Sequence, residues 1–325
     1  MNNRTLLYII IGILGVFIVG TIISIFIIGG SLTELKPELV GKASGTISVI
    51  NDQPYVISNT KLFKIDNSEL KLQKEFANDS QIELNPFGLY VTEKRPDIKT
   101  VYDLSSFQTI QKTNGRFFAW LSKDNYLITN STDKTKGTDA GELTETAYRG
   151  SIANTQRDTL FTSQFITYML LSDNTYIDLA QRDNEDNFNN ITINQFTKLS
   201  GLQKITNKKN FGYKPFSTLG FSLIQENISS SPVYLIRDKQ LTQLTITNNI
   251  QAIAAINSNT LIYLDKDTKQ NTMFLYSYDI SKQQSKPIAK LPVEFKQITS
   301  LAVNSQYIYL NSELGIYKMS IKDLI

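Results

Sequence analysis

The side chains that could do chemistry in this chain are carboxylates, lysines, tyrosines and hydroxyls, because its 325 residues include neither histidine nor cysteine. Without histidine there is no Ser-His-Asp triad, no imidazole ligand for zinc and no side chain that ordinarily titrates near neutral pH. Without cysteine there is no disulfide, no thiolate nucleophile and no thiolate metal ligand. Any catalysis would therefore depend on carboxylates, Lys, Tyr or Ser.

The acidic segments do not predict a metal site. The strongest candidate, AQRDNEDNFNN at 180–190, places acidic and amide side chains at alternate positions from Asp183, as a calcium loop does. A calcium loop also needs Gly at its sixth position and Glu at its twelfth. Here those positions hold Phe188 and Asn194, so we interpret the segment as a solvated loop between strands.

The sequence also assigns no catalytic residue and no cofactor. Three Ser-x-x-Lys pairs, beginning at Ser58, Ser68 and Ser131, lack the Lys-Thr-Gly and Ser-Asp-Asn motifs that accompany such pairs in penicillin-binding enzymes. The sequence has no Gly-rich phosphate loop. Its formal net charge of +3 does not indicate a nucleic-acid partner, since such domains concentrate basic residues on one face.

One segment mixes basic and aromatic residues in a way that can bind a ligand. In ITNKKNFGYKPF, from Ile205, the residues Lys208, Lys209, Tyr213 and Lys214 could hold a phosphate polymer or a sugar through charge and stacking. The alternative is a strand whose aromatic side chains lie in the core while its lysines face solvent. These four residues are the candidate ligand patch.

An uninterrupted apolar segment at residues 6–28 predicts one transmembrane helix. No charge falls between Arg4 and Glu34. At ~1.5 Å per residue, a helix of this length spans about 34 Å, enough to cross a ~30 Å hydrocarbon core. A cleaved signal peptide would have a shorter apolar region ending at a small-x-small site, so we expect the segment to remain as an anchor.

The charges beside this segment predict its direction. Arg4 and the amino terminus precede it, whereas the charges of Glu34, Lys36 and Glu38 nearly cancel after it. The positive-inside rule therefore predicts a single-pass cell-membrane protein with residues 1–5 in the cytoplasm and the C-terminal domain outside.

Within and after the anchor, two further features are expected. Gly20 and Ser24 form a small-xxx-small pair that could pack against another helix, although a lone helix facing lipid is the alternative. Residues 29–44 are expected to form a short stalk, followed by an extracytoplasmic domain at 45–325.

In this outer domain, short alternating strands are separated by Asn, Asp, Ser and Gly turns, and helical periodicity nearly vanishes. Similar turns recur before an alternating strand with a mean spacing of about 42 residues, at Asp52, Gly88, Asn125, Asn174, Ser230, Asn259 and Gln306. A strand with an aromatic residue followed by Asp comes after several of them. A period of 40–45 residues with about four strands per unit is typical of a β-propeller blade.

Two segments carry a resemblance to known propellers. VYDLSSFQTI, from Val101, and YSYDISKQQSK, from Tyr276, resemble the Tyr-Asp strand of WD40-like and YVTN-like propellers. The resemblance covers most of the outer domain as a pattern, without Trp-Asp or Gly-His dipeptides, and the single Trp is Trp120.

The repeat and the resemblance together predict an all-β propeller of about seven blades, with six or eight also possible. A pair of stacked sheets, a β-sandwich, is the alternative fold. The final unit supplies about three strands, and a strand near residue 47 is expected to complete that blade. The stretch 130–160 is expected to be a long loop from the third blade.

Three functions remain open from the sequence. The leading prediction is a non-catalytic, membrane-anchored binding or scaffold protein that contacts a protein or an envelope polymer. The first alternative is a bitopic subunit of a pilus, secretion or envelope-assembly machine. The second is a glycan-active propeller enzyme, which would need carboxylates that converge at the axis, although the sequence shows no acidic cluster on its apolar inner strands.

Overall fold

The structure is a computed structural model, and it describes part of the chain. The described residues are 32, 34–133, 143–154, 156–163, 166–170, 177–184, 187–191, 211–216, 219, 221–226, 232–238, 240–246, 250–267, 269 and 271–323. The predicted anchor at 6–28, with Gly20 and Ser24, lies outside these residues. Among the described residues, no helix has the length and apolar character needed to cross a bilayer.

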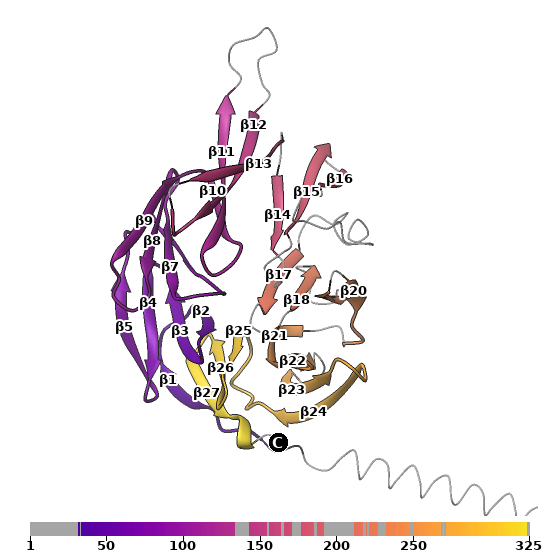
Figure 1. The fold of residues 1–325 in the computed structure, drawn as a ribbon. Coiled ribbons are helices and arrows are strands. Elements are labelled where there is room, and N and C mark those ends of the chain that lie inside the picture. The colour runs from indigo at the N-terminus through magenta and orange to yellow at the C-terminus, as the bar shows by residue number, and fades with distance from the viewer. Residues whose placement is uncertain are drawn as a thin grey trace, which may run out of the picture.

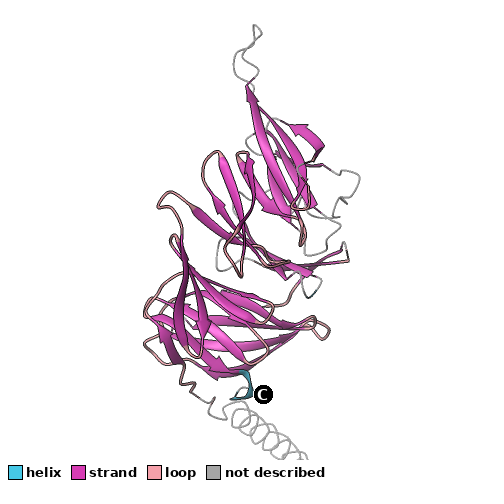
Figure 2. Cartoon of the chain, turned by 60° about the vertical axis from the view of Figure 1, so that its left-hand side comes forward, coloured by secondary structure: helices cyan, strands magenta, loops and turns pink. Residues whose placement is uncertain are grey.

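The prediction of an all-β propeller is confirmed. Antiparallel sheets are arranged around a central axis as blades, which we number in chain order (Figure 1). Figure 2 shows the same sheets from another side, with the one described helix, the short 3-10 helix η2 (Ile321–Asp323), at the C-terminus.

The strands of each blade follow one another in the chain, except in blade 7. Blades 1 to 3 consist of β2 (Thr46–Ile50), β3 (Gln53–Ser58), β4 (Lys61–Asp66), β5 (Glu69–Glu75); β6 (Gln81–Leu84), β7 (Tyr90–Lys94), β8 (Ile98–Asp103), β9 (Thr109–Asn114); and β10 (Phe117–Trp120), β11 (Asn125–Asp133), β12 (Leu143–Ser151), β13 (Arg157–Ser163). Blades 4 and 5 consist of β14 (Ile166–Leu170), β15 (Ile177–Asn184), β16 (Asn187–Ile191); and β17 (Phe211–Phe216), β18 (Phe221–Glu226), β19 (Val233–Arg237), β20 (Gln240–Gln243). Blades 6 and 7 consist of β21 (Ile250–Asn257), β22 (Thr260–Asp267), β23 (Thr272–Asp279), β24 (Gln284–Lys290); and β25 (Ile298–Val303), β26 (Tyr307–Ser312), β27 (Gly315–Ser320), β1 (Glu38–Gly41).

The predicted number of about seven blades is corrected to six complete, four-stranded blades. The remaining sheet, blade 4, has three strands among the described residues. The predicted number came from counting the turns at which a hairpin begins. Such a turn does not show that its sheet has all four strands.

The turns predicted by the repeat join the first and second strands of a blade. This is confirmed at every such turn within the described residues, at or beside Asp52, Gly88, Asn125, Asn259 and Gln306. The other two predicted turns, at Asn174 and Ser230, lie outside them.

Asn and Asp, rather than Gly, make several of these tight turns possible. Between β2 and β3, Asn51 and Asp52 have φ angles of 49° and 65°. The next two turns of blade 1 contain Asn59 and Asn67 with φ angles of 51° and 48°. Two-residue hairpin turns need this left-handed conformation, and Asn and Asp tolerate it better than most residues.

The aromatic-Asp signature marks the end of a third strand. In blade 2, Asp103 ends β8, and its carboxylate accepts hydrogen bonds from the backbone N–H groups of Ser105 at 2.9 Å and Ser106 at 2.8 Å. Hydrogen bonds from the Ser105 hydroxyl and from Ser106 lower the pKa of Asp103. The Asp of this signature therefore contributes to turn formation.

The ring is closed by a strand that the sequence assigned to the stalk. Strand β1 pairs with β27, with Leu39 opposite Tyr317, and completes blade 7. Just before it, Leu35 is buried in the core shared by blades 6 and 7. The strand near residue 47 instead begins blade 1. The propeller thus starts before residue 45, because the outer edge of β27 pairs with the chain as it enters the ring.

The stretch 130–160 is corrected from a long loop to mostly strand. Strands β11 and β12 pair continuously from Asn125 opposite Ser151 to Asp133 opposite Leu143, and they extend beyond the other blades (Figure 1). The segment is rich in threonine, whose β-branched side chain favours strands, and this preference outweighs its polar composition.

Gly315 provides a test of how the ring closes. Its φ of +135° is a conformation that residues with a side chain rarely adopt, and a Cβ there would lie 2.5 Å from the carbonyl oxygen of Gly41 in β1. We expect Gly315→Ala to lower the free energy of unfolding by about 1–3 kcal/mol, and to increase hydrogen exchange of the β1 amides. Denaturant titration and hydrogen exchange measure the two effects.

The matched control is Gly88→Ala, since Gly88 does not have a positive φ and its closest neighbour is the exposed Lys123 side chain. Wild-type exchange rates in the β1 amides of Gly315→Ala would contradict closure by β1.

Candidate functional site

A cavity of about 1080 Å³ lies where the first strands of several blades face one another. Its described lining comes from blades 1, 2, 5, 6 and 7. This volume slightly exceeds the usual range for ligand sites, about 300–1,000 Å³, so the cavity is large enough to hold a ligand of several rings.

The two ends of the cavity carry polar residues, and its middle is largely apolar. Strands β2 and β25 run side by side in the same direction. Two hydrogen bonds show this: Ile47 N–H donates to Ser300 Oγ at 3.2 Å, and the Ser305 hydroxyl donates to Asp52. The partners are 253 residues apart in both pairs, as parallel strands require. Their C-terminal ends therefore meet at one mouth, which holds Asn51, Asp52, Asn304 and Ser305. Their N-terminal ends meet at the other, which holds Thr46 and Thr299. The apolar wall between them includes Ile47, Val49, Leu223, Ala252, Ala254, Leu301 and Val303.

Asp52 is one of two carboxylates in the described lining. The backbone N–H of Ser305 donates to its Oδ1 at 2.7 Å, and the Ser305 hydroxyl donates to its Oδ2 at 2.6 Å. Asn304 donates through its side-chain amide to the Asp52 carbonyl at 3.2 Å. These bonds fix the carboxylate at the mouth and also join blade 1 to blade 7.

Glu83 in β6 is the other carboxylate. It forms an ion pair with Lys94 in β7, and Lys94 also donates to the carbonyl oxygen of Phe118 in β10 at 2.9 Å. The Glu83 side chain is 31% exposed and the Lys94 side chain 22%. Glu83 is among the residues that line the cavity, and its partner Lys94 connects it to blade 3.

These groups limit the chemistry that the cavity can support. Two carboxyl groups can act as an acid and a base, and the amides and hydroxyls at the mouths can bind hydroxyl groups of a ligand. Within the part of the chain that is described, no group of three or more carboxylates gathers as a metal site would require.

The predicted ligand patch is not tested by the described part of the chain. The backbone of Tyr213 and Lys214 lies in β17, opposite Ile224 and Leu223 of β18. Lys208 and Lys209 lie outside the described residues. The patch therefore stays a prediction.

Sequence reasoning recorded Asp52 only as a turn residue and did not single out Glu83. A usable signal was present, since the repeated turns mark the mouth at which the first strands end. An acidic residue at or just before such a turn is therefore placed near the axis, and Asp52 and Glu83 both meet this condition.

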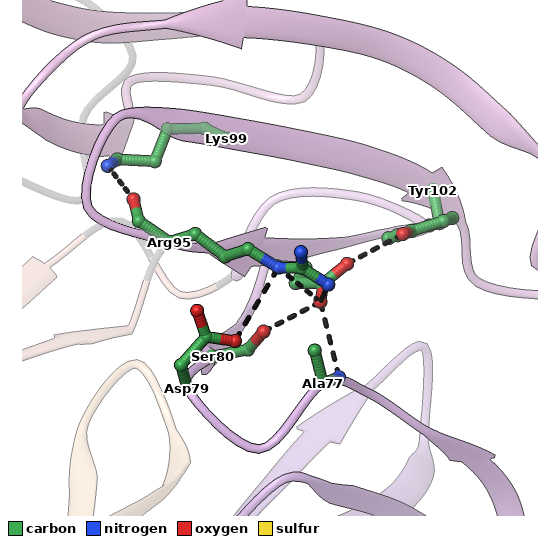
Figure 3. Close-up of polar contacts among 7 residues, drawn as sticks. Ala77, Asp79, Ser80, Arg95, Lys99 and Tyr102 are labelled. Atoms are coloured by element: carbon green, nitrogen blue, oxygen red, sulfur yellow. Dashed lines mark hydrogen bonds and ion pairs between the residues drawn. The ribbon is translucent and has the colours of Figure 1, made fainter.

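A second polar cluster lies away from the cavity and surrounds Glu93 of β7 (Figure 3). The Ser80 hydroxyl donates to Glu93 Oε1 at 2.6 Å and the Tyr102 hydroxyl to Oε2 at 2.7 Å. The Arg95 guanidinium donates at 3.1 Å and the backbone N–H of Ala77 at 3.3 Å, both to Oε1. Because Ala77 and Ser80 belong to the connection between blades 1 and 2, the cluster attaches that connection to blade 2.

The charges of this cluster are strongly stabilised. Burial alone would raise the pKa of Glu93, but the hydrogen bonds from Ser80, Tyr102, Arg95 and Ala77 lower it to about 2. Burial and the same carboxylate raise the pKa of Tyr102 to about 12. Every donor serves the same buried carboxylate, so we assign the cluster a structural role.

Lys99 closes the neighbouring hairpin turn. Its ammonium group donates to the carbonyl oxygens of Arg95 and, at 2.9 Å, of Pro96. Burial lowers the pKa of Lys99, and the nearby Lys94 lowers it further. With its donors directed at turn carbonyls, Lys99 also has a structural role.

Comparison with known proteins identifies the class of fold. No protein-family model and no curated protein sequence matches the chain. Among solved structures, oligogalacturonate lyase from Vibrio parahaemolyticus has a TM-score of 0.55 at 8% identity, over 86% of this chain and 90% of that chain. A structure of oligogalacturonate lyase in complex with manganese has a TM-score of 0.55 at 9% identity, with the same coverage.

The WD40 domain of Sif2 has a TM-score of 0.49 at 12% identity, over 86% of this chain and 81% of that chain. At these identities, the likeness to the solved structures shows a shared propeller fold alone.

The comparison corrects the leading functional prediction, a non-catalytic binding or scaffold protein. The similar propellers that cover most of both chains include an enzyme, oligogalacturonate lyase. The lack of His and Cys removes imidazole and thiol chemistry but leaves carboxylates, and the cavity contains two of them.

Proposed function

We propose that this protein is a carbohydrate-active propeller enzyme that binds an oligosaccharide in its central cavity and cleaves it with carboxylates. The observation that carries the proposal is the presence of Asp52 and Glu83 in the lining of one large axial cavity. The fold shared with oligogalacturonate lyase supports it, since a propeller of this kind can house glycan chemistry.

The composition of the cavity suits a saccharide. Sugar rings present hydroxyl groups at their edges and C–H groups on their faces. The mouths offer amide and hydroxyl partners such as Asn51 and Thr299, and the wall between them offers aliphatic side chains such as Val49 and Leu301. Ligand sites commonly combine an apolar lining with a few polar groups that fix orientation.

Asp52 and Glu83 would divide the chemistry between them. In glycoside hydrolysis, one carboxylic acid protonates the leaving oxygen as the C–O bond breaks, and one carboxylate takes a proton from the attacking water. Glu83, which forms an ion pair with Lys94, is assigned as the base. Asp52 is then the acid, positioned by Ser305.

A metal does not enter this chemistry. One similar structure is a complex with manganese. The described residues of this chain include no group of three metal-binding side chains, and the whole sequence lacks His and Cys. Among the described residues, the donors therefore do not form such a centre.

The proposal is tested by measuring new reducing ends after the full-length chain, purified in detergent, is incubated with a panel of oligosaccharides. We expect cleavage of at least one member. Asp52→Asn and Glu83→Gln should each lower kcat by about 100-fold or more, as expected when a catalytic acid or base is lost. Both substitutions keep the side-chain shape, so the melting temperature checks that each variant is folded.

Glu313→Gln is the matched control, because Glu313 is exposed in the turn between β26 and β27 and does not line the cavity. Failure to cleave any saccharide, or full activity in both cavity variants, would overturn the proposal.

We also propose that the predicted segment at 6–28 anchors the enzyme, with the propeller on the extracytoplasmic side. Support comes from the length and charge pattern of the sequence. Protease treatment of intact cells tests it: digestion of the propeller is expected, and its full protection would contradict this orientation.

A further inference from the structure

We infer that the cavity takes oligosaccharides without acidic groups and excludes uronates. The inference rests on the proposed function and specifies the class of its substrate. The observation behind it is the charge of the wall: the described lining includes Asp52 and Glu83 but no lysine or arginine.

Lys94, the cation paired with Glu83, is already engaged. Its ammonium group contacts Glu83 and donates to the carbonyl oxygen of Phe118. Asp52 accepts hydrogen bonds from the backbone N–H and the hydroxyl of Ser305, and these donors carry no charge. Among the described lining residues, an acidic sugar would thus meet negative charge.

Binding sites for carboxylates have the opposite composition. They supply Arg or Lys, often as a bidentate fork, or several backbone N–H groups. In this cavity the polar atoms near the mouths belong to Asn, Ser and Thr side chains, which hydrogen-bond to hydroxyl groups without a charge. Specificity therefore comes both from repulsion between the two carboxylates and an acidic sugar and from hydrogen bonds to the hydroxyl groups of an uncharged sugar.

The candidate ligand patch would have predicted the reverse preference. Lys208, Lys209 and Lys214 are cations suited to an acidic polymer. The described cavity lining and the predicted patch therefore favour opposite ligands, and one experiment can separate them.

The experiment is isothermal titration of the full-length protein, carrying Glu83→Gln to prevent cleavage, at about 0.1 M salt, where charges still interact at close range. The probes are hexasaccharides: uncharged ones of gluco, galacto, manno and xylo configuration, and hexagalacturonate. We expect at least one uncharged hexasaccharide to bind 10-fold or more tightly than hexagalacturonate, even though this variant lacks one of the two charges.

A charge variant provides a second readout. Thr46 is exposed at one mouth and lines the cavity, so Thr46→Lys adds a cation there with little effect on folding. It should increase the affinity for hexagalacturonate, relative to the affinity for the uncharged ligand, about 10-fold. Thr109→Lys is the matched control, since Thr109 is exposed in β9 away from the cavity, and it should change neither affinity.

The outcomes distinguish this inference from the function on which it rests. Tighter binding of hexagalacturonate than of every uncharged probe overturns the inference and leaves the enzyme proposal standing. Binding of no saccharide overturns both. An equal gain in hexagalacturonate affinity in Thr46→Lys and Thr109→Lys places the uronate elsewhere on the surface and overturns the assignment of selectivity to the cavity.

Discussion

Trp120→Ala should lower the free energy of unfolding by about 3–5 kcal/mol, the range measured for removal of large aromatic side chains from protein cores. Trp120 is fully buried in β10 of blade 3. Its ring stacks on Tyr90 of blade 2, with centroids 5.8 Å apart, and its indole N–H donates to Thr92 Oγ1 at 3.1 Å. The substitution would therefore leave a cavity and an unpaired buried hydroxyl between two blades.

The surrounding rings cannot easily fill that cavity. Phe118 packs against Trp120 edge to face with centroids 5.3 Å apart, and Tyr126 does so at 6.3 Å. Both are themselves nearly fully buried and belong to the same core cluster. Close-packed interiors relax only partly after such a loss, so most of the destabilisation should remain.

Urea denaturation followed by circular dichroism measures this effect, because Trp120 is the only tryptophan and its fluorescence is lost in the variant. Trp120→Phe should destabilise less than Trp120→Ala, since it keeps an aromatic ring and leaves a smaller cavity while removing the hydrogen bond to Thr92. Leu72→Ala is the control: Leu72 is 52% exposed, so its change should stay within about 0.5 kcal/mol. A urea midpoint of Trp120→Ala equal to that of the wild type would contradict the role of Trp120 in holding blades 2 and 3 together.

Glu93→Gln should lower stability at pH 7 by about 3 kcal/mol, from the difference between the ordinary and folded pKa values of Glu93, 4.5 and about 2. The pKa is lower in the folded state, so the folded protein holds the proton less tightly than the unfolded chain. The stabilisation is therefore fully present above pH 4.5 and is lost as the pH falls toward 2. Gln removes this part of the pH dependence because it has no proton to gain.

The measurement is the free energy of unfolding at several pH values between 7 and 2. Wild-type protein should lose stability steeply below pH 4.5, and Glu93→Gln should show a shallower decline. Glu75→Gln is the control, because the Glu75 side chain is 53% exposed and its ion pair with Lys61 is a surface contact worth about 0–1 kcal/mol. Parallel pH curves for wild-type and Glu93→Gln would contradict the assigned role of the cluster.

The sequence by itself determined the kind of fold. Turn residues such as Asn51 and Asp52 act through their own backbone conformation, and Asp103 binds the N–H groups of residues two and three positions later. Because these interactions involve only neighbouring residues, they recur wherever the sequence pattern recurs. The spacing of such turns therefore predicts hairpins of propeller size without any knowledge of how the blades meet.

Only the tertiary structure decided how the ring closes and what faces its axis. Asp52 meets Ser305 across 253 residues, and β1 pairs with the last strand of the chain. Glu83 reaches the cavity wall, while Lys94, its partner, is turned toward blade 3. These contacts depend on the rotation of each blade about the axis, which no local preference encodes. The turn pattern could therefore place acidic residues near the axis, but it could not show which of them line the cavity.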